Sequence, residues 1–266
     1  MRGNVITLTG PGAEPITLTE AKAHLRVDGT DEDGLITALI VAAREHVENH
    51  TARVLVARSM RSYFPGFPAR MDLVAPLQSV ASVKYLEDSA GTETTLATTN
   101  YVVDAYELPG VVTEAYSTTY PTTYDHPQAV RVAFTAGYVA PFTADTTTNV
   151  LTVSGRTYTD GDVVRLTNSG GALPTGLSAG TDYYVRDASG YTVKLAATSG
   201  GTAIDITGAG TGTHFVGEIP QPIRAAMLLL IGHLYANREA VNVGNIVTTV
   251  PLAVDALLAP YRVAGF

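Results

Sequence analysis

Residues 219–239, IPQPIRAAMLLLIGHLYANRE, decide the fold of this chain of 266 residues. The two prolines at its start suit the first turn of a helix, where backbone N–H groups have no partner within the helix. In the middle of the stretch, over residues 223–236, only Arg224 and His233 are clearly polar. A helix that is apolar around almost its whole circumference must be covered on several sides. The stretch therefore predicts a helix, ending near Glu239, at the centre of a helical bundle.

Two partner helices are predicted near the beginning of the chain. Thr17 and Glu20 have capping-box spacing, in which the hydroxyl accepts from a backbone N–H and the carboxylate reaches back to the cap. They open a short helix that runs to about Val27. The acid-rich residues 30–33 open a second helix, to about His50, since acidic side chains favour a helix N-terminus. Its apolar stripe consists of Leu35, Leu39, Ala43 and Val47, with Ile36 and Ile40 beside it. Helices at both ends of the chain can bury these faces only against one another.

The sequence between these helices has the pattern of strands. From residue 54 to about 139 the apolar period is two and Pro and Gly mark turns, which predicts a small β subdomain. Its strands are expected near residues 57–64, 80–86, 101–104 and 130–134. Residues 141–217 hold 13 of the 25 glycines and predict a separate all-β module. Its strands are expected near residues 150–153, 163–166, 183–186, 191–195, 203–206 and 213–216, a spacing typical of a sandwich or barrel.

The predicted fold class is thus α+β. Residues 1–140 and 218–266 form a bundle of N-terminal and C-terminal helices with its small β subdomain. Residues 141–217 are an inserted all-β domain, a sandwich or a barrel. The residues that flank the insertion, Tyr138 and Glu218, are expected to lie close together.

Composition narrows the classes of function. With 17 Lys and Arg against 25 Asp and Glu, the net charge is -8, and no basic run is present that could neutralise successive phosphates. Direct gripping of nucleic acid is therefore not expected. Cysteine is absent, so disulfides, thiolate nucleophiles and cysteine-bearing zinc sites are excluded. The N-terminal ten residues show no export signal. The longest apolar run, residues 225–232, is far shorter than the roughly 20 residues of a membrane span. A soluble protein is expected.

Two glycine patterns resemble catalytic motifs. Residues 176–180, GLSAG, match the GxSxG pattern of a hydrolase nucleophile, which needs a strand before the serine and a helix after it. Pro174 precedes this pattern and a strand-like segment follows, so a loop is expected. Gly208, Gly210 and Gly212 are spaced like part of a phosphate loop, but they lack the third glycine at GxGxxG spacing, a following helix and a lysine. A hairpin turn is expected there.

Histidine and tyrosine give two further candidate sites. His46 and His50 lie at i and i+4, a spacing that can chelate zinc, but Val47 stands where a metalloprotease has its general-base Glu. A solvated helix end is the prediction for this pair, and His233 is predicted to be a hydrogen-bonded core or interface residue. In the inserted module, four tyrosines could form a sugar-stacking surface. They are Tyr158, Tyr183, Tyr184 and Tyr191. The preferred interpretation is that alternate tyrosines fill the core of the module.

Several stretches resemble a known family. They are PITLTEAKAHLRVDGTDEDGLITALIVAAREHVENHTARVL at 15–55, LQSVASVKYLED at 77–88, YVVD at 101–104, VRVAFTAGY at 130–138, IPQPIRAAMLLLIGHLYANREAV at 219–241 and VPLAVDALLAPYRV at 250–263. In this order they resemble the head-tail connector proteins of tailed phages and gene transfer agents, also called adaptor or head-completion proteins. The resemblance stops at the insertion, whose residues 161–201 look instead like a β module found among phage tail and fibre proteins.

The resemblance implies a structural role and no enzymatic activity or cofactor. It implies a ring of about twelve copies between the portal protein and a tail stopper or terminator protein, in the virion at the head-tail junction, after assembly in the cytoplasm of the bacterial host. DNA would pass through the channel without specific binding, and no membrane would be involved. Twelve copies at -8 each total -96, and an acidic conduit would repel the phosphates of DNA.

The C-terminal segment is the candidate contact surface. The loop at residues 241–250 carries no charge and many apolar residues, and such density is unusual in a permanently solvated loop. We expect portal or subunit contacts from Arg238, Val243, Ile246, Val247, Leu252, Leu257, Leu258, Tyr261, Arg262 and Phe266. The opposing interpretation is that these residues close the core of the bundle. The alternative function is a binding module, in which the inserted domain recognises a host glycan or a neighbouring tail protein.

Overall fold

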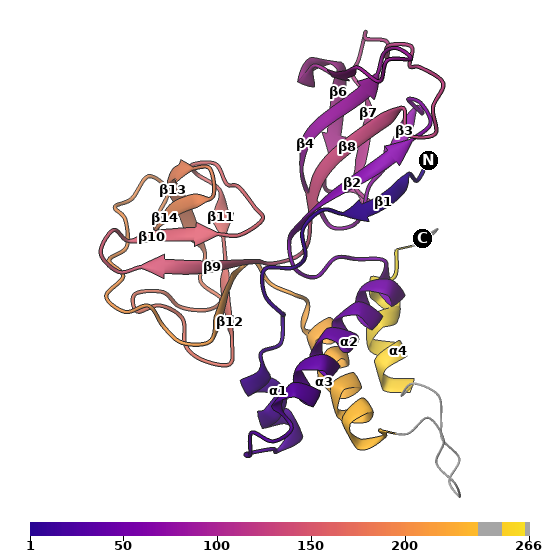
Figure 1. Cartoon of the computed structure of the whole chain (residues 1–266). Coiled ribbons are helices and arrows are strands. Elements are labelled where there is room, and N and C mark those ends of the chain that lie inside the picture. The colour runs from indigo at the N-terminus through magenta and orange to yellow at the C-terminus, as the bar shows by residue number, and fades with distance from the viewer. Residues whose placement is uncertain (239–251, 264–266) are drawn as a thin grey trace, which may run out of the picture. The chain divides into compact units, whose positions relative to one another are not determined.

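The computed structural model describes residues 1–238 and 252–263 of the chain (Figure 1). It contains two compact units. The first consists of Met1–Pro11 and Ala57–Gly137, and the second of Gly12–Val56 and Tyr138–Phe266. The first unit is all-β, whereas the second joins a helical bundle to a seven-stranded sheet. The α+β class is therefore confirmed.

The first unit is built from two sheets. Five strands are ordered β1-β2-β8-β4-β5 and three are ordered β3-β7-β6. Their bounds are β1 Asn4–Thr7, β2 Arg58–Phe64, β3 Arg70–Asp72, β4 Leu77–Leu86, β5 Glu93–Thr95, β6 Tyr101–Asp104, β7 Val111–Glu114 and β8 Val130–Ala136, with a short 3-10 helix at Thr98–Asn100. Strands β2 and β8 bury alternate residues, such as Phe64 and Phe134. All four predicted strands are present, while β1, β3, β5 and β7 were not predicted.

The helices of the second unit come from both ends of the chain. They are α1 Leu18–Leu25, α2 Asp33–Thr51, α3 Gln221–Ala236 and α4 Leu252–Leu258, followed by a 3-10 turn at Ala259–Tyr261. Helix α3 packs against the other three helices. Its residues Ile223, Met227 and Leu230 lie in one buried cluster with Ile36 and Ile40 of α2. The prediction that terminal helices share one core is confirmed.

The buried face of α2 differs from the predicted stripe. The core side is formed by Ile36, Ile40, Ala43 and Val47. Leu35 is 36% exposed and Leu39 is only partly buried, so these two residues were wrongly placed at the centre of the stripe. At 100° per residue, Leu35 and Leu39 lie at the edge of that face. The predicted stripe and the observed stripe both repeat with a helical period, so the period alone does not select between them.

The remainder of the second unit is a nearly closed barrel. Its strand order is β11-β13-β14-β10-β9-β15-β12. The bounds are β9 Ala140–Asp145, β10 Val150–Val153, β11 Val163–Val164, β12 Leu166–Ser169, β13 Tyr183–Ser189, β14 Thr192–Ala196 and β15 Thr213–Val216. Only Arg165 separates β11 from β12, so the two outermost strands are successive parts of one bent segment and bring the sheet ends together.

Two details of the barrel depart from the predicted strands. Residues 203–206 form a single bridge, between Ala203 and Ala196, instead of a strand. Ile206 is nevertheless buried, so the apolar pattern there reflects packing without a ladder. Strand β9 was not predicted, although it supplies the neighbour of both β10 and β15.

The two ends of the barrel segment meet. Ala140 at the start of β9 is paired with Val216 at the end of β15. A methyl group built on Gly217 would come within 2.5 Å of the carbonyl oxygen of Tyr138. The expected closeness of the flanking residues is therefore observed. Gly217 also has a φ of +101°, a conformation that glycine adopts without the steric cost of a side chain.

Candidate partner-binding surface and the junction of barrel and bundle

Arg238 lies just beyond α3 and ties that end of the helix to the start of α2. Its guanidinium donates to a carboxylate oxygen of Glu32 and lies over the ring of Tyr235, 4.9 Å from the ring centroid. The hydroxyl of Tyr235 donates to the other oxygen of Glu32. These hydrogen bonds, from Tyr235 first and Arg238 second, lower the pKa of Glu32. Arg238 is exposed, so it can contact another protein without any change in the core.

The other predicted contact residues divide into exposed and buried ones. Leu252 is 82% exposed and Arg262 is also exposed. Leu258 is fully buried in the helical cluster, and Leu257 and Tyr261 are partly buried against it. The carbonyl of Tyr261 accepts a hydrogen bond from Nε of Arg53 at 2.5 Å. Val243, Ile246, Val247 and Phe266 lie outside the described residues. Within the described part, α4 thus has one face in the core and one toward solvent.

The N-terminus of α1 is joined to the barrel by a polar cluster. The hydroxyl of Thr17 accepts from the backbone N–H of Glu20, as predicted. The carboxylate of Glu20 does not reach back to the cap. Instead, the backbone N–H of Thr17 donates to Oγ of Ser169, at 2.9 Å, and Ser169 and Arg224 both donate to Oε2 of Glu20. Ser169 of β12 therefore takes the place of the capping carboxylate, which frees Glu20 to bind α3.

The close fit at this junction requires a glycine next to Ser169. Gly170 has a φ of +74°, and a methyl group built on it would lie 2.1 Å from Oγ1 of Thr17. Ser169 itself is only 1% exposed. On the paired strand β15, Phe215 packs into the helical cluster. Barrel and bundle are therefore joined by both polar and apolar contacts. No local sequence pattern marks Ser169, because its partners Thr17 and Glu20 lie about 150 residues away.

We expect Ser169→Ala to lower the free energy of unfolding by about 2 kcal/mol. The change leaves the backbone N–H of Thr17 without its partner and removes one of the two donors to Oε2 of Glu20, and hydrogen bonds to charged groups contribute about 1.5–3 kcal/mol each. Chemical denaturation of the full chain measures the loss. Ser178→Ala is the matched control, because Ser178 is exposed and surface changes usually stay within about 0.5 kcal/mol. Equal stability of both variants would contradict the assigned role of Ser169.

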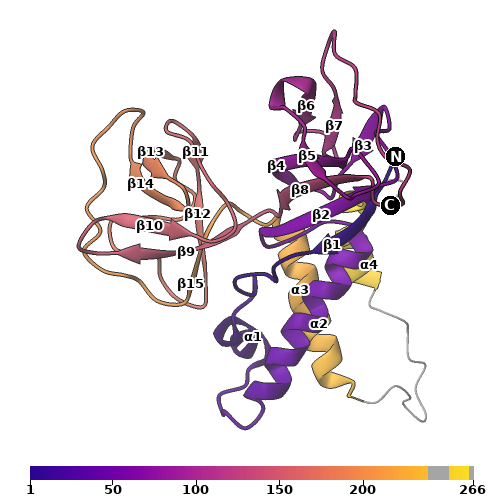
Figure 2. The same cartoon turned by 45° about the horizontal axis from the view of Figure 1, so that its top comes forward.

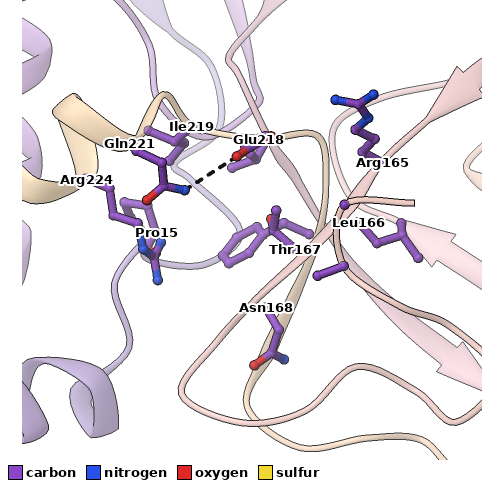
Figure 3. A pocket seen from close by; sticks show the side chains of 13 residues that line it. Pro15, Arg165, Leu166, Thr167, Asn168, Glu218, Ile219, Gln221 and Arg224 are labelled. Atoms are coloured by element: carbon purple, nitrogen blue, oxygen red, sulfur yellow. Dashed lines mark hydrogen bonds between the residues drawn. The ribbon is translucent and has the colours of Figure 1, made fainter. Parts of the chain in front are cut away.

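A pocket of about 230 Å³ lies beside this junction (Figure 3). Apolar side chains of Leu166, Phe215 and Ile219 line part of it. Its charged groups are already engaged. Arg224 donates to the carbonyl of Pro15 at 3.0 Å, and Arg165 pairs with Asp182 at 2.5 Å. The amide of Gln221 donates to Glu218, as Figure 3 shows. This arrangement contains neither a nucleophile beside a base nor a set of side chains that converge on a ligand. We interpret the pocket as a gap in the packing where barrel and bundle meet.

The motifs that resemble catalytic ones lie in loops. Ser178 is followed by Gly180 and then by strand β13, without a helix, and its backbone N–H donates to the hydroxyl of Tyr183. The predicted loop is confirmed. Gly210 and Gly212 have positive φ and lie against the backbone of residues 169–174. Both glycines lie in the loop before β15, and this loop packs against the segment that follows β12. The expected hairpin turn is therefore wrong.

The histidine pair and the tyrosines follow their local packing. His46 and His50 are partly buried and stack with ring centroids 6.1 Å apart. Among residues 1–238 and 252–263, no three His, Cys, Asp or Glu side chains gather as a metal site would require. In the barrel, Tyr158 and Tyr183 are buried, as predicted for alternate tyrosines, and burial raises the pKa of Tyr158 to about 12. Tyr191 is 56% exposed and offers no stacking platform together with them.

Residues 15–106 match the model of a family described as phage gp6-like head-tail connector protein. Over this segment the chain is similar to gp6-like connector proteins. The connector segment runs from α1 to just beyond β6 and so takes in parts of both units. The family is structural and not enzymatic. No curated protein matches the chain in sequence, and no helix among the described residues is both long and apolar enough to cross a membrane.

Solved structures extend the likeness beyond the connector segment. One is a chain from the neck of an empty gene transfer agent particle computed with C6 symmetry, with a TM-score of 0.57 and 17% identity over 99% of this chain and 97% of that one. Another comes from the neck of a native particle computed with C12 symmetry, with a TM-score of 0.56 and 16% identity over 99% and 97%. At such identity the likeness is one of fold, and it extends over nearly the whole length of each chain.

Proposed function

We propose that this chain is a head-tail connector of a tailed phage or gene transfer agent, which forms a ring below the portal. The observation that carries the proposal is the connector match over residues 15–106. The likeness of nearly the whole fold to a chain from a neck with C12 symmetry supports a ring of twelve copies. In this role the ring extends the DNA channel and offers the tail stopper or terminator protein its attachment site.

The acidic composition suits a DNA conduit. Twelve copies at -8 each total -96, and a channel wall of one sign repels phosphates of the same sign. The genome would then pass without adhering to the wall.

Co-expression with the portal protein of the same particle tests the proposal. The chain and the portal are expected to purify together, and electron microscopy of the complex is expected to show a twelvefold ring attached to the portal. Both proteins are tested at concentrations well above those in an infected cell. The proposal is contradicted if the chain stays monomeric beside an intact portal ring.

We propose that the exposed side of α4 contributes to portal contact. Leu252 is 82% exposed and Leu258 is fully buried, so the two positions separate contact from folding. Leu252→Asp is expected to leave the melting temperature unchanged and to weaken co-purification with the portal at least tenfold, because apolar anchors dominate interfaces. Val163→Asp, at a residue of the barrel that is 57% exposed, is the control. Normal portal binding by Leu252→Asp removes this contact.

We propose further that the barrel, residues 141–217, is an insertion into the connector core. Replacing it with a short Gly/Ser linker is expected to leave a folded protein, because Ala140 and Val216 are paired neighbours and chain ends that meet tolerate such exchange. A lower melting temperature is expected as well, because the deletion removes Phe215 from the helical cluster. Circular dichroism and thermal melts measure both effects. An insoluble product, also with a linker twice as long, would contradict the insertion.

A further inference from the structure

The first unit has four edge strands, β1 and β5 in one sheet and β3 and β6 in the other, and of these β1 and β6 carry exposed large apolar side chains. Strand β1 stands at one end of the order β1-β2-β8-β4-β5, and β6 stands at one end of β3-β7-β6. Within the described residues, the named strand β6 pairs only with β7, and β1 pairs only with β2. An edge strand presents unpaired N–H and C=O groups that can pair with another chain. Charged side chains and Pro commonly block such edges; β1, NVIT, carries neither, and β6, YVVD, carries only Asp104 at its end.

These two edges lie on opposite sides of the unit. A bridge between Arg2 and Asp72 joins the β1 side to β3. Only residues 96–100 separate β5 from β6, so β6 lies on the same side as β5, at the far end of both sheets. Both views of the fold show β1 and β6 on opposite sides of this unit (Figures 1 and 2). One copy of the chain can therefore engage two neighbours at once.

The β6 side is unusually apolar for a solvated surface. The described chain has fourteen exposed large hydrophobic residues, and five of them lie within residues 102–116. They are Val102 at 52%, Val103 at 37%, Tyr106 at 98%, Leu108 at 45% and Tyr116 at 97% exposed. Tyrosine is enriched in protein interfaces because it combines a large contact area with a polar tip. Two of the five, Val102 and Val103, lie on the edge strand β6, and the other three lie in the turn before β7 or just after β7. Such a concentration around one hairpin indicates a docking surface and not scattered surface residues.

The stretch from the end of β4 through β5, β6 and β7 to the start of β8 is acidic. Residues 85–130 contain seven Asp and Glu and no Lys or Arg. Of the seven, only Glu93 and Glu107 form ion pairs within the described part of the chain, while Asp104 at the end of β6 and Glu114 opposite Tyr101 form none. On the β1 side, Arg2 is the one charged side chain of residues 1–11.

A second cation adds to the basic character of the β1 side. Arg61 of β2 stands opposite Ile6 in the strand register and makes no ion pair with any described residue. Ile6 and Leu8 on this side are 40% and 43% exposed. The β1 edge is therefore apolar and basic, which complements the apolar and acidic β6 edge.

We infer that the β6 edge of one copy binds the β1 edge of a second copy. The occupant is this chain itself, because the β1 and β6 edges are complementary in charge and both carry exposed apolar side chains. A contact between two different patches is heterologous, and its repetition closes a ring when the rotation allows closure. The inference rests on the proposed ring and names the surface through which neighbouring copies in that ring meet.

The absence of cysteine makes a disulfide test clean. In an Ile6→Cys/Val102→Cys variant, oxidation of the protein co-expressed with portal is expected to give a ladder of covalent oligomers. Each single-cysteine variant is expected to give no band above a dimer, and Ile6→Cys/Val163→Cys, which places the second thiol on the barrel, is expected to give no ladder. A double variant without a ladder overturns the inference.

Blocked edges give a second, independent measurement. Val102→Lys alone and Ile6→Lys alone are each expected to prevent self-association with unchanged melting curves, because both residues are exposed. An equimolar mixture of the two variants retains one intact edge of each kind and is expected to form a 1:1 dimer. Assembly of Val102→Lys like the unmodified chain overturns the inference.

The two proposals fail in different ways. A ring on the portal without a disulfide ladder leaves the function standing and removes the edge contact. A ladder in a protein that never binds portal keeps the edge contact and removes the function.

Discussion

Leu230→Asp is expected to unfold the helical bundle at a much lower temperature than the unmodified chain. Leu230 of α3 is 3% exposed and lies in the cluster shared with α1, α2 and α4. A carboxylate there loses its hydration without gaining a partner, and the buried leucine is lost as well, at a combined cost on the order of 4 kcal/mol or more. For a chain of this size such a loss lowers the melting temperature by roughly 10 °C.

The neighbouring residue supplies the control for this prediction. Leu229 on the same helix is 39% exposed, so Leu229→Asp is expected to change the melting temperature by no more than a few degrees. Leu228 is half-buried, and Leu228→Asp is expected to fall between the two. Differential scanning calorimetry of the three variants measures the order. An unchanged melt for Leu230→Asp would mean that α3 does not lie at the centre of the bundle.

Arg44→Met is the second change with a large expected effect. Arg44 is 5% exposed, and its guanidinium donates to Glu14 at 2.8 Å and to Glu48 at 3.0 Å. Glu48 also accepts from the backbone N–H of Leu55 at 2.8 Å. The guanidinium is thus held by two carboxylates that are mostly buried, those of Glu14 before α1 and Glu48 near the end of α2. Breaking a buried pair by removing one partner costs about 3–5 kcal/mol, because the remaining charge stays buried.

The control for Arg44 lies next to it in the sequence. Glu45 also contacts the guanidinium, at 3.4 Å, but its side chain is 60% exposed. Glu45→Gln is therefore expected to change stability by less than about 0.5 kcal/mol, as exposed pairs do. Urea denaturation separates the two variants by their midpoints. A loss below about 1 kcal/mol for Arg44→Met would fall well short of the cost of a broken buried pair and would show that the network contributes little.

The helical core was the most predictable part of the fold. The length and apolarity of residues 223–236 leave one physical solution, a helix covered on several sides. The exact face of α2 was less predictable, because Leu35 and Ile36 both fit a helical period and only the packing of α3 selects between them. The capping role of Glu20 could not be foreseen, since its partners Ser169 and Arg224 are brought to it by tertiary structure.

The strands were predicted where side chains alternate and missed where they do not. Strand β6 was predicted at its observed bounds, and β2, β4 and β8 within a few residues of theirs. Strand β1 has three exposed residues of four, so hydrophobic alternation gives no signal there. For the predicted contact residues, the sequence could not separate Leu252 from Leu258, because a helix of seven residues has too few turns to define its buried face.

The charge of residues 85–130 is a sequence signal for the β6 edge. Seven carboxylates without a single Lys or Arg over this stretch distinguish one side of the first unit from the other. Elsewhere in the chain 17 Lys and Arg nearly balance the other 18 Asp and Glu, so this stretch supplies seven of the eight net negative charges. Charge counted segment by segment therefore singles out this edge from the sequence alone.

The order of the elements along the chain has a consequence for biosynthesis. Helix α2 ends at Thr51, but α3, against which it packs, begins only at Gln221. A ribosome adding about 5–20 residues per second needs roughly ten to thirty seconds to reach that helix. During this interval Ile36 and Ile40 lack their native cover, whereas the strands at residues 57–137, together with the earlier β1, already have all their partners. We expect the apolar face of α2 to be open to a chaperone on the nascent chain until α3 is made.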